Sequence, residues 1–138
     1  MNDMENKIFS SSVIVVVNNK ILLIQRSNYD GQGELWNTPA GHFKEGETAI
    51  ECAVRELYEE TKISVKEDDF IFFTDFESSI GKVYFYILRL ENFPEIVLSA
   101  ESLRYEWVTL NDLNKYNFLY DKQKEILEMF IKNKGPGR

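Results

Sequence analysis

Three glutamates crowd into five residues near the middle of the chain, at Glu56, Glu59 and Glu60. In a helix, residues three and four positions apart share one face with Cβ atoms about 5–6 Å apart, so these carboxylates converge. Like charges at that spacing destabilise a helix by roughly 0.2–0.5 kcal/mol per pair. A divalent cation reverses the repulsion, because Mg²⁺ and Mn²⁺ prefer oxygen ligands. The cluster therefore predicts a metal site. The alternative is a solvated acidic face, since glutamate is common on exposed helices.

The residues upstream have fixed spacings that a solvated face does not require. Five residues separate Gly41 from Glu47, and seven separate Glu47 from Arg55, which Glu56 follows directly. The set is completed by Leu57, Glu59, Glu60 and Ile63. This pattern resembles the signature of the Nudix hydrolase family, G-x5-E-x7-R-E-U-x-E-E-x-G-U, in which U is a bulky apolar residue. The one departure is Lys62, which stands where the family has glycine. So many fixed spacings together make a specific signal.

The resemblance implies an α/β fold, the α/β/α sandwich of the family around a mixed sheet, in which the signature forms a loop, a helix and a loop. It covers residues 36–63, and the order of strands elsewhere is compatible with a single domain spanning residues 1–138. The activity it implies is metal-dependent hydrolysis of the diphosphate linkage of a nucleoside diphosphate derivative or similar small molecule. The alternatives are a catalytically inactive module of this fold that binds a ligand or regulates, and an acidic helix surface that binds a protein partner.

The resemblance also implies which residues hold the metal, expected to be Mg²⁺ or Mn²⁺. Glutamates at the positions of Glu56, Glu59 and Glu60 bind it in the family, and we add Glu47 and a backbone carbonyl near Ala40 or Gly41 as candidate ligands. A divalent ion neutralises phosphate charge, orients the phosphate chain and lowers the pKa of bound water. These are the requirements for cleaving a phosphate anhydride.

Arg55 is expected to support catalysis by pairing with Glu47 across the loop and helix, which restrains the ligands. The alternative is an exposed pair with Glu59 at i+4. Gly41 and Gly46 are expected to serve backbone geometry, because glycine accepts positive φ cheaply and allows close approach to metal or phosphate.

The general base must reach the attacking water, directly or through one other water. Similar enzymes often recruit a glutamate outside the signature, and Glu101 in the stretch ESLRYEW is the candidate here. Glu56 is the alternative base. Glu106 and Glu77 are weaker candidates, and a solvated loop glutamate explains each of these three non-signature residues as well.

Substrate contacts are expected from Arg26 and Lys44, which could touch phosphates, and from Phe43, which could stack on a base. Further aromatic candidates are Tyr29, Phe76 and Tyr84, with core packing as the default interpretation for most aromatics. The only histidine, His42, receives no catalytic role, because a lone imidazole lacks co-ligands.

The surrounding pattern predicts the elements that position these residues. Apolar runs at 13–17 and 21–25 indicate two strands joined by a tight turn, followed by a polar loop at 27–34. Thr48 and Glu51 form a capping-box pattern, so a helix should begin near Thr48. Further elements are expected as strands at 70–73, 83–90 and 104–108, one helical turn near 111, and a helix at 121–131. The run at 83–90 lacks alternation, which predicts a strand covered on both faces.

Composition limits the partners. The chain has 138 residues, 43% of them hydrophobic, which favours a folded domain over disorder. A net charge of −7 disfavours binding to long nucleic acid or anionic lipid. The apolar run at 13–17 is too short for a signal peptide or membrane span, and the single Cys52 allows no internal disulfide, so we expect a cytoplasmic protein. The first several residues and residues 134–138 are expected to be loose ends. The expected partner is a small-molecule diphosphate, and a homodimer is left open.

Overall fold

The computed structural model describes residues 7–27 and 35–133. Within them, seven strands form one mixed sheet in the order β3-β2-β1-β6-β5, with β4 paired to β1 and β7 paired to β2. β1 runs parallel to β6 and antiparallel to β2 and β4. The strands are β1 Ile8–Val17, β2 Lys20–Arg26, β3 Trp36–Asn37, β4 Ala40–His42, β5 Phe70–Glu77, β6 Gly81–Leu90 and β7 Ser102–Thr109.

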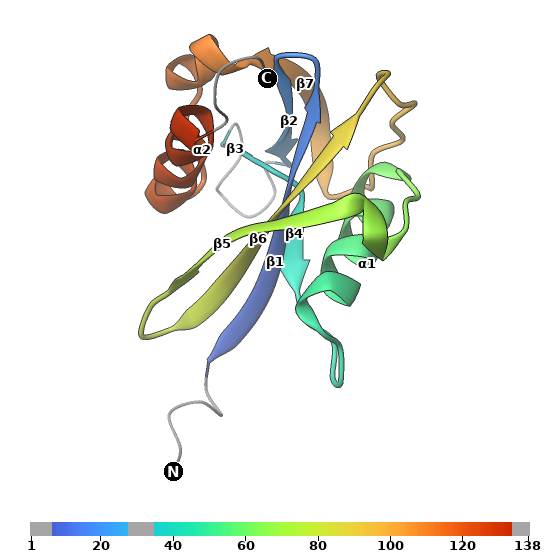
Figure 1. Ribbon diagram of the computed structural model, residues 1–138, viewed down its shortest axis with the longest axis vertical. Helices are drawn as coiled ribbons and strands as arrows, with labels where there is room; N and C mark the ends of the chain where they lie inside the picture. Colours follow the sequence, from blue (N-terminus) through green and yellow to red (C-terminus); the bar gives the residue numbers. More distant parts are fainter. Residues whose placement is uncertain (1–6, 28–34, 134–138) are drawn as a thin grey trace.

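Two helices cover opposite faces of this sheet, α1 at Ala49–Thr61 and α2 at Asp121–Asn133 (Figure 1). Alternate residues of β1 divide between the two layers: Val13 and Val15 pack with the cluster under α1, and Ile14 and Val16 with the cluster under α2. Short 3₁₀ helices occupy Glu67–Asp69 and Leu110–Lys115. The arrangement confirms the expected α/β/α sandwich around a mixed sheet.

The strand that lacks alternation is indeed buried on both faces. Four consecutive residues of β6, from Phe85 to Leu88, are buried. Tyr86 and Leu88 belong to the cluster under α1, and Ile87 belongs to the cluster under α2. β1 is likewise buried from Ser11 to Val17, so the two parallel strands form the centre of the core.

β1 begins at Ile8, five residues before the predicted strand. The polar residues of that stretch do not look like a buried strand in the sequence. They can be buried because two serines find hydrogen-bond partners elsewhere in the fold. Ser11 Oγ donates to the Ala49 carbonyl at 2.6 Å, and Ser12 Oγ lies 2.5 Å from Thr38 Oγ1. β3 and β4 were not predicted, and β5 continues to Glu77, four residues beyond the predicted end.

The other predicted elements agree with the structure. The turn between β1 and β2 consists of two residues, and Asn18 adopts a φ of 56°. β6, β7, the helical turn after β7 and α2 all occur where the pattern placed them. Most of the predicted loop at 27–34, including Tyr29, and most of the loose ends fall outside the described residues. In the described part of the chain, no helix is long and apolar enough to cross a membrane.

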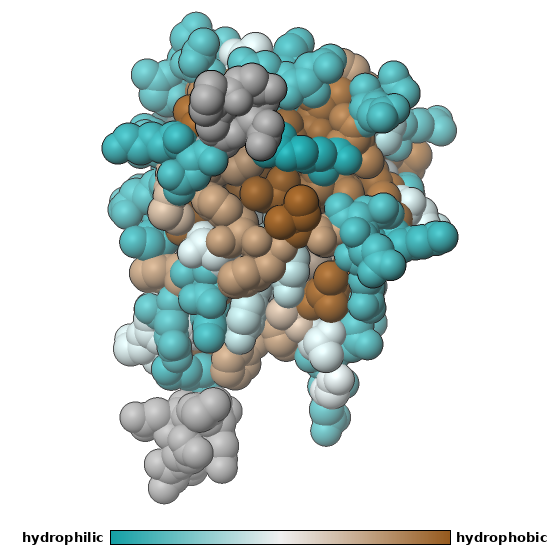
Figure 2. All heavy atoms as spheres, viewed as in Figure 1, coloured by the Kyte–Doolittle hydropathy of each residue, from teal (hydrophilic) through white to brown (hydrophobic). Residues whose placement is uncertain are grey.

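The edge strand β5 exposes two large apolar side chains, Ile71 and Phe72. Figure 2 shows hydrophobic residues gathered in the middle of this view, where β5 crosses in Figure 1, with hydrophilic residues around them. The pairing of β5 with β6 shifts register between Phe72 and Thr74. Such an irregularity disfavours pairing of an edge with another strand.

The C-terminus of α1 ends in a left-handed residue that is not glycine. Lys62 has φ 66° and ψ 14°, and its N–H donates to the Tyr58 carbonyl at 2.8 Å. Its ammonium lies 4.8 Å from the centre of the Tyr58 ring. The signature departs from the family at this position, yet the backbone keeps the conformation that glycine favours.

Replacing Lys62 with glycine should stabilise the protein. We expect the free energy of unfolding to rise by about 0.5–1 kcal/mol, because relief of roughly 1–2 kcal/mol is partly offset by the greater entropy of glycine in the unfolded chain. Urea denaturation would measure the change. The control is Lys62→Ala, which removes the ammonium but keeps the left-handed cost, and should bring no gain. If the glycine and alanine variants are equally stable, the left-handed conformation of Lys62 does not destabilise the protein.

Candidate active site

The signature helix begins as its capping box predicts. Thr48 Oγ1 accepts from the Glu51 N–H at 3.2 Å, and the Glu51 carboxylate accepts from the Thr48 N–H at 2.9 Å. The loop before it turns at Gly46, where φ is 78°. The loop and the first turn of α1 are thus fixed locally, which places the later glutamates of the helix relative to the strand before them.

Arg55 is the hub of the acidic cluster. Its guanidinium donates to both oxygens of Glu47 at 2.7 and 2.9 Å, to Glu56 at 2.9 Å and to Glu59 at 3.1 Å. It also donates to the His42 carbonyl at 2.9 Å, while the histidine itself is exposed. The expected pair with Glu47 and the alternative pair with Glu59 therefore both form. One cation partly neutralises three carboxylates.

The Glu47 carboxylate is held as a partner of Arg55. Its side chain is only 12% exposed, and it accepts from the Lys44 N–H at 2.8 Å as well as from the guanidinium. The hydrogen bond from Arg55 lowers the pKa of Glu47 from its usual 4.5 to about 2, against the opposing effect of burial. Glu47 thus closes the loop onto the helix, and its role as a metal ligand stays a prediction.

Gly41 leaves space for the Glu56 carboxylate. A Cβ atom at this glycine would lie 2.0 Å from Glu56 Cδ, so any other residue would push the acid aside. The Gly41 carbonyl accepts a hydrogen bond from the thiol of Cys52 at 3.4 Å. Burial raises the pKa of that thiol to about 11, so Cys52 is a small buried side chain that stays protonated at neutral pH.

Glu60 lies near other carboxylates and has no cationic side chain among its described hydrogen-bond partners. Its carboxylate accepts from the Ala40 N–H at 3.1 Å. Burial raises the pKa of Glu60 well above its usual value, and the nearby charges of Glu56 and Glu101 raise it further, while the Ala40 hydrogen bond opposes them. Glu56 and Glu60 therefore share a partly buried position, and the exposed Glu101 adds negative charge from outside the signature.

Glu101 reaches this position through a loop that packs across the end of α1. The Ser99 N–H approaches the Glu60 carbonyl at 3.4 Å, and the Glu101 carbonyl accepts from the Ser27 N–H at 3.0 Å. Arg26, the last residue of β2, directly precedes Ser27. The structure thus places the predicted base and the predicted phosphate-binding arginine in neighbouring segments beside the cluster.

The weaker base candidates have other partners. Glu106 accepts a hydrogen bond from the Tyr116 hydroxyl, which raises the pKa of that tyrosine to about 12. Glu77 pairs with Lys7 at 2.8 Å. Both acids therefore already have a partner of their own.

The predicted substrate contacts near the loop differ in surroundings. Lys44 is exposed, and its ammonium lies 3.9 Å from Glu59. Phe43 is partly buried, with its ring 5.8 Å from that of Tyr84 and 5.9 Å from that of Phe9. These contacts show that the Phe43 ring packs between the loop and the sheet, and a contact of this ring with the substrate stays a prediction. Phe76 lies 4.6 Å from the Lys122 ammonium.

Comparison with known proteins identifies the family of this chain. A family model described as NUDIX domain matches residues 8–130. The chain belongs to the Nudix family. It is 28% identical over 120 residues to the 8-oxo-dGTP diphosphatase of Buchnera aphidicola, covering 82% of this chain and 91% of that protein. It is 43% identical over 58 residues to the phosphatase NudJ of Escherichia coli, covering 42% of this chain and 37% of that protein.

Solved structures show the same fold. A MutT structure reported for Aliivibrio salmonicida and Vibrio cholerae superposes with a TM-score of 0.79 at 23% identity, covering 91% of this chain and 98% of that one. The predictions of a Nudix hydrolase and of an enzyme that cleaves a diphosphate are therefore confirmed.

Nudix hydrolases generally use divalent metal ions, and the donor set of this Nudix chain fits one. Glu56, Glu59 and Glu60 offer carboxylate oxygens, the ligands that hard cations prefer. Among the described residues, no group of three or more His, Cys, Asp or Glu side chains is already arranged around a common point. In this structure Arg55 donates hydrogen bonds to Glu56 and to Glu59.

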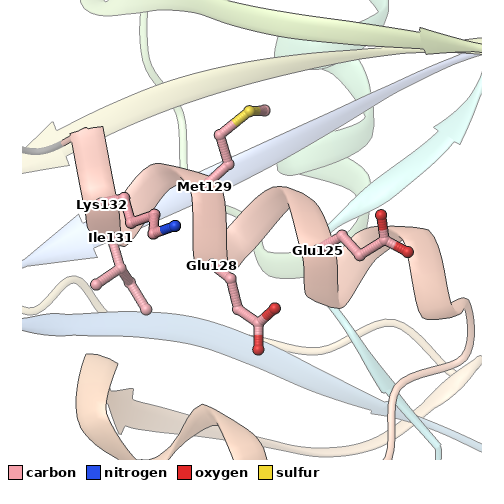
Figure 3. A pocket seen from close by; sticks show the side chains of 5 residues that line it. All are labelled: Glu125, Glu128, Met129, Ile131 and Lys132. Atoms are coloured by element: carbon pink, nitrogen blue, oxygen red, sulfur yellow. The ribbon is translucent and has the colours of Figure 1, made fainter.

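A hollow of about 480 Å³ on the outer surface of α2 is separate from this cluster. Figure 3 shows its lining side chains, all from one helix: Glu125, Glu128, Met129, Ile131 and Lys132. None of them is a predicted site residue, and we assign no ligand there.

The sequence-based predictions omit three buried polar residues that connect to the cluster, Ser12, Thr38 and Gln123. For Gln123 a signal exists in the sequence. It lies three, four and seven positions before Ile126, Leu127 and Phe130, so the helical period puts it on the buried stripe of α2. A polar residue on such a stripe requires a hydrogen-bond partner.

The pair between Glu47 and Arg55 predicts a pH-dependent stability for this Nudix protein. Because the pKa of Glu47 is lower in the folded protein, its stabilisation is complete above pH 4.5 and is lost as the pH falls toward 2. In EDTA at pH 7, Glu47→Gln should lower the free energy of unfolding by about 2 kcal/mol, the value of hydrogen bonds to a charged group.

Urea denaturation at pH 7 and at pH 3 would test this, and the difference between wild type and variant should shrink at the lower pH. Glu45→Gln, which removes an exposed charge from the same loop, should leave stability nearly unchanged at both values. A deficit in Glu47→Gln that does not change with pH would contradict the assigned pair.

Proposed function

We propose that this protein is a Mg²⁺- or Mn²⁺-dependent hydrolase that cleaves the diphosphate linkage of a nucleoside diphosphate derivative or similar small molecule. The observation that carries the proposal is the position of Glu60. Its carboxylate is partly buried, held by the Ala40 N–H and flanked by the charges of Glu56 and Glu101. A bound divalent cation would compensate that charge, as it would the charge of a diphosphate.

Each residue of the cluster has a proposed role. Glu56 and Glu60 hold the metal, with Glu59 and the Gly41 carbonyl as further ligands. Arg55 and Glu47 keep the loop and helix together, so that the ligands approach from fixed directions. When bound, the metal would neutralise phosphate oxygens and lower the pKa of a bound water.

The proton of the attacking water goes to a carboxylate. Glu101 is the proposed base, because its segment packs against the end of α1 that carries Glu60 and it makes no hydrogen bond to Arg55 among the described contacts. Glu56 is the alternative, although its carboxylate already accepts from Arg55. Arg26 and Lys44 are proposed to contact the phosphates, and Phe43 to contact the rest of the substrate.

The relatives support a nucleotide as substrate, since the protein from Buchnera aphidicola is named for 8-oxo-dGTP. We propose the cytoplasm as the location, in keeping with the free, buried Cys52. Long nucleic acid and membranes are not proposed as partners, and a homodimer stays a prediction.

Removing one ligand charge should abolish turnover without unfolding the protein. We expect Glu60→Gln to reduce kcat/KM by at least about 10²-fold with Mg²⁺ or Mn²⁺, because the variant keeps the side-chain volume but loses the charge that holds the metal. The assay would screen 8-oxo-dGTP, nucleoside triphosphates, nucleotide sugars, ADP-ribose and dinucleoside polyphosphates, and would identify the products.

The control for this experiment is Glu45→Gln, which should hydrolyse like wild type. Turnover of Glu60→Gln at the wild-type rate would remove Glu60 from the metal site. Tight binding of a nucleotide by wild type, with no turnover in any metal, would instead support the inactive binding module.

The two candidate bases can be told apart by metal binding. Glu101→Gln should lower kcat by about 10²–10⁴-fold while the affinity for Mn²⁺ stays near that of wild type, because a base acts on the water and not on the metal. Glu106→Gln should change neither quantity. If Glu101→Gln keeps its kcat while Glu56→Gln loses both kcat and affinity for Mn²⁺, Glu56 and not Glu101 is the general base.

A further inference from the structure

The Glu60 carboxylate accepts a hydrogen bond from a peptide group whose carbonyl is held by other residues. The Ala40 N–H that donates to Glu60 shares a peptide plane with the Pro39 carbonyl. All described peptide bonds are trans, so this N–H and this carbonyl point in opposite directions. The carbonyl accepts from the Val13 N–H at 2.9 Å and from Ser12 Oγ at 3.2 Å. Whatever fixes the carbonyl therefore aims the donor at Glu60.

A chain of buried hydrogen bonds leads from that carbonyl to helix α2. Ser12 Oγ lies 2.5 Å from Thr38 Oγ1, which accepts from Gln123 Nε2 at 2.9 Å. The Gln123 carbonyl oxygen in turn accepts from the Thr38 N–H at 3.3 Å. All three residues are at most 5% exposed. The Gln123 amide thus hydrogen-bonds both the backbone N–H and the side-chain hydroxyl of Thr38.

The direction of the protons along this chain follows from its ends. The Gln123 NH₂ group can only donate, so the Thr38 hydroxyl accepts from it and turns its own proton toward Ser12. The Ser12 hydroxyl then has its proton free for the Pro39 carbonyl, which can only accept. Gln123 thus sets the orientation of both hydroxyls, although it lies on the opposite layer from α1.

We propose that Gln123 is a positioning residue for the metal site. Through Thr38, Ser12 and the Pro39–Ala40 peptide it aims the Ala40 N–H at Glu60 and so fixes the direction from which this carboxylate approaches a metal. The inference rests on the proposed function in one respect, that Glu60 binds the metal.

The position of Gln123 supports a role beyond filling space. Its neighbours on the buried stripe are Ile126, Leu127 and Phe130, so an apolar residue would suit the packing. Burying an amide in such surroundings is unfavourable unless it is hydrogen-bonded. The amide offers a donor and an acceptor at once, which is what the N–H and hydroxyl of Thr38 together require.

The test measures metal binding and the Ala40 amide separately from turnover. Mn²⁺ alone would be titrated into metal-free protein and free Mn²⁺ followed by electron paramagnetic resonance. We expect Gln123→Leu to raise the dissociation constant about 10-fold, the lower end of the effect of residues that support metal ligands. In metal-free protein, the NMR resonance of the Ala40 amide proton should move upfield as its hydrogen bond to Glu60 weakens.

Two further variants separate the hydrogen-bond chain from general damage to the core. Thr38→Val removes the hydroxyl and should behave like Gln123→Leu, whereas Thr38→Ser keeps it and should restore wild-type Mn²⁺ affinity and Ala40 shift. Ile126→Val removes a methyl group from the same helix without altering the hydrogen-bond chain. It should leave the Mn²⁺ affinity and the Ala40 amide shift unchanged. The valine variant at position 38 also serves if Gln123→Leu does not fold.

The outcomes distinguish this inference from the proposed function. Wild-type Mn²⁺ affinity and an unmoved Ala40 amide in Gln123→Leu or Thr38→Val would overturn the positioning role, even where Glu60→Gln loses the metal. An equal loss of affinity in Ile126→Val would overturn it too, because the effect would then be general. Wild-type Mn²⁺ affinity in Glu60→Gln would refute the metal role of Glu60, and the positioning role with it.

Discussion

The fold of the acidic region depends on a single cation. Glu47, Glu56 and Glu59 all accept hydrogen bonds from the guanidinium of Arg55, which also donates to the backbone of the loop. Without it, carboxylates at helical spacing would repel one another and the loop would lose its tie to the helix. The guanidinium suits the task because its planar fork offers five donors in fixed directions. Glu60 is the acid left outside this arrangement, and burial and the charge of Glu56 raise its pKa.

Two different layers of the molecule determine how Glu60 is presented. The helix that carries it is capped locally and packs on one face of the sheet. The N–H that binds its carboxylate belongs to the strand connection at Pro39 and Ala40, which contacts β1 and, through Thr38, the opposite helix. A site on a surface helix is thus tied to the centre of the core.

Much of this was predictable from the sequence where the signal was local. The capping box at Thr48, the two-residue turn at Asn18 and the unbroken apolar run of β6 each predicted the element that formed. The first half of β1 was hidden because Ser11 and Ser12 look polar, and only partners distant in the chain make their burial acceptable. The approach of Glu101 to Glu60 depends on a loop that folds back over the end of α1. No pattern in the sequence predicts that path of the loop.

The parallel pairing of β1 with β6 has a consequence for how the chain folds. It joins Ile8 to Gly81 and Val17 to Leu90, so residues separated by about half of the chain must come together before the central strands pair. Closing such a loop costs entropy before any contact is gained, and chains rich in distant pairings fold slowly. The signature helix can form early because its contacts are local, but the strand connection that aims at Glu60 rests on β1. Glu60 therefore reaches its final direction only after this pairing is complete, so a chain still being synthesised contains the acids of the site before the site has formed.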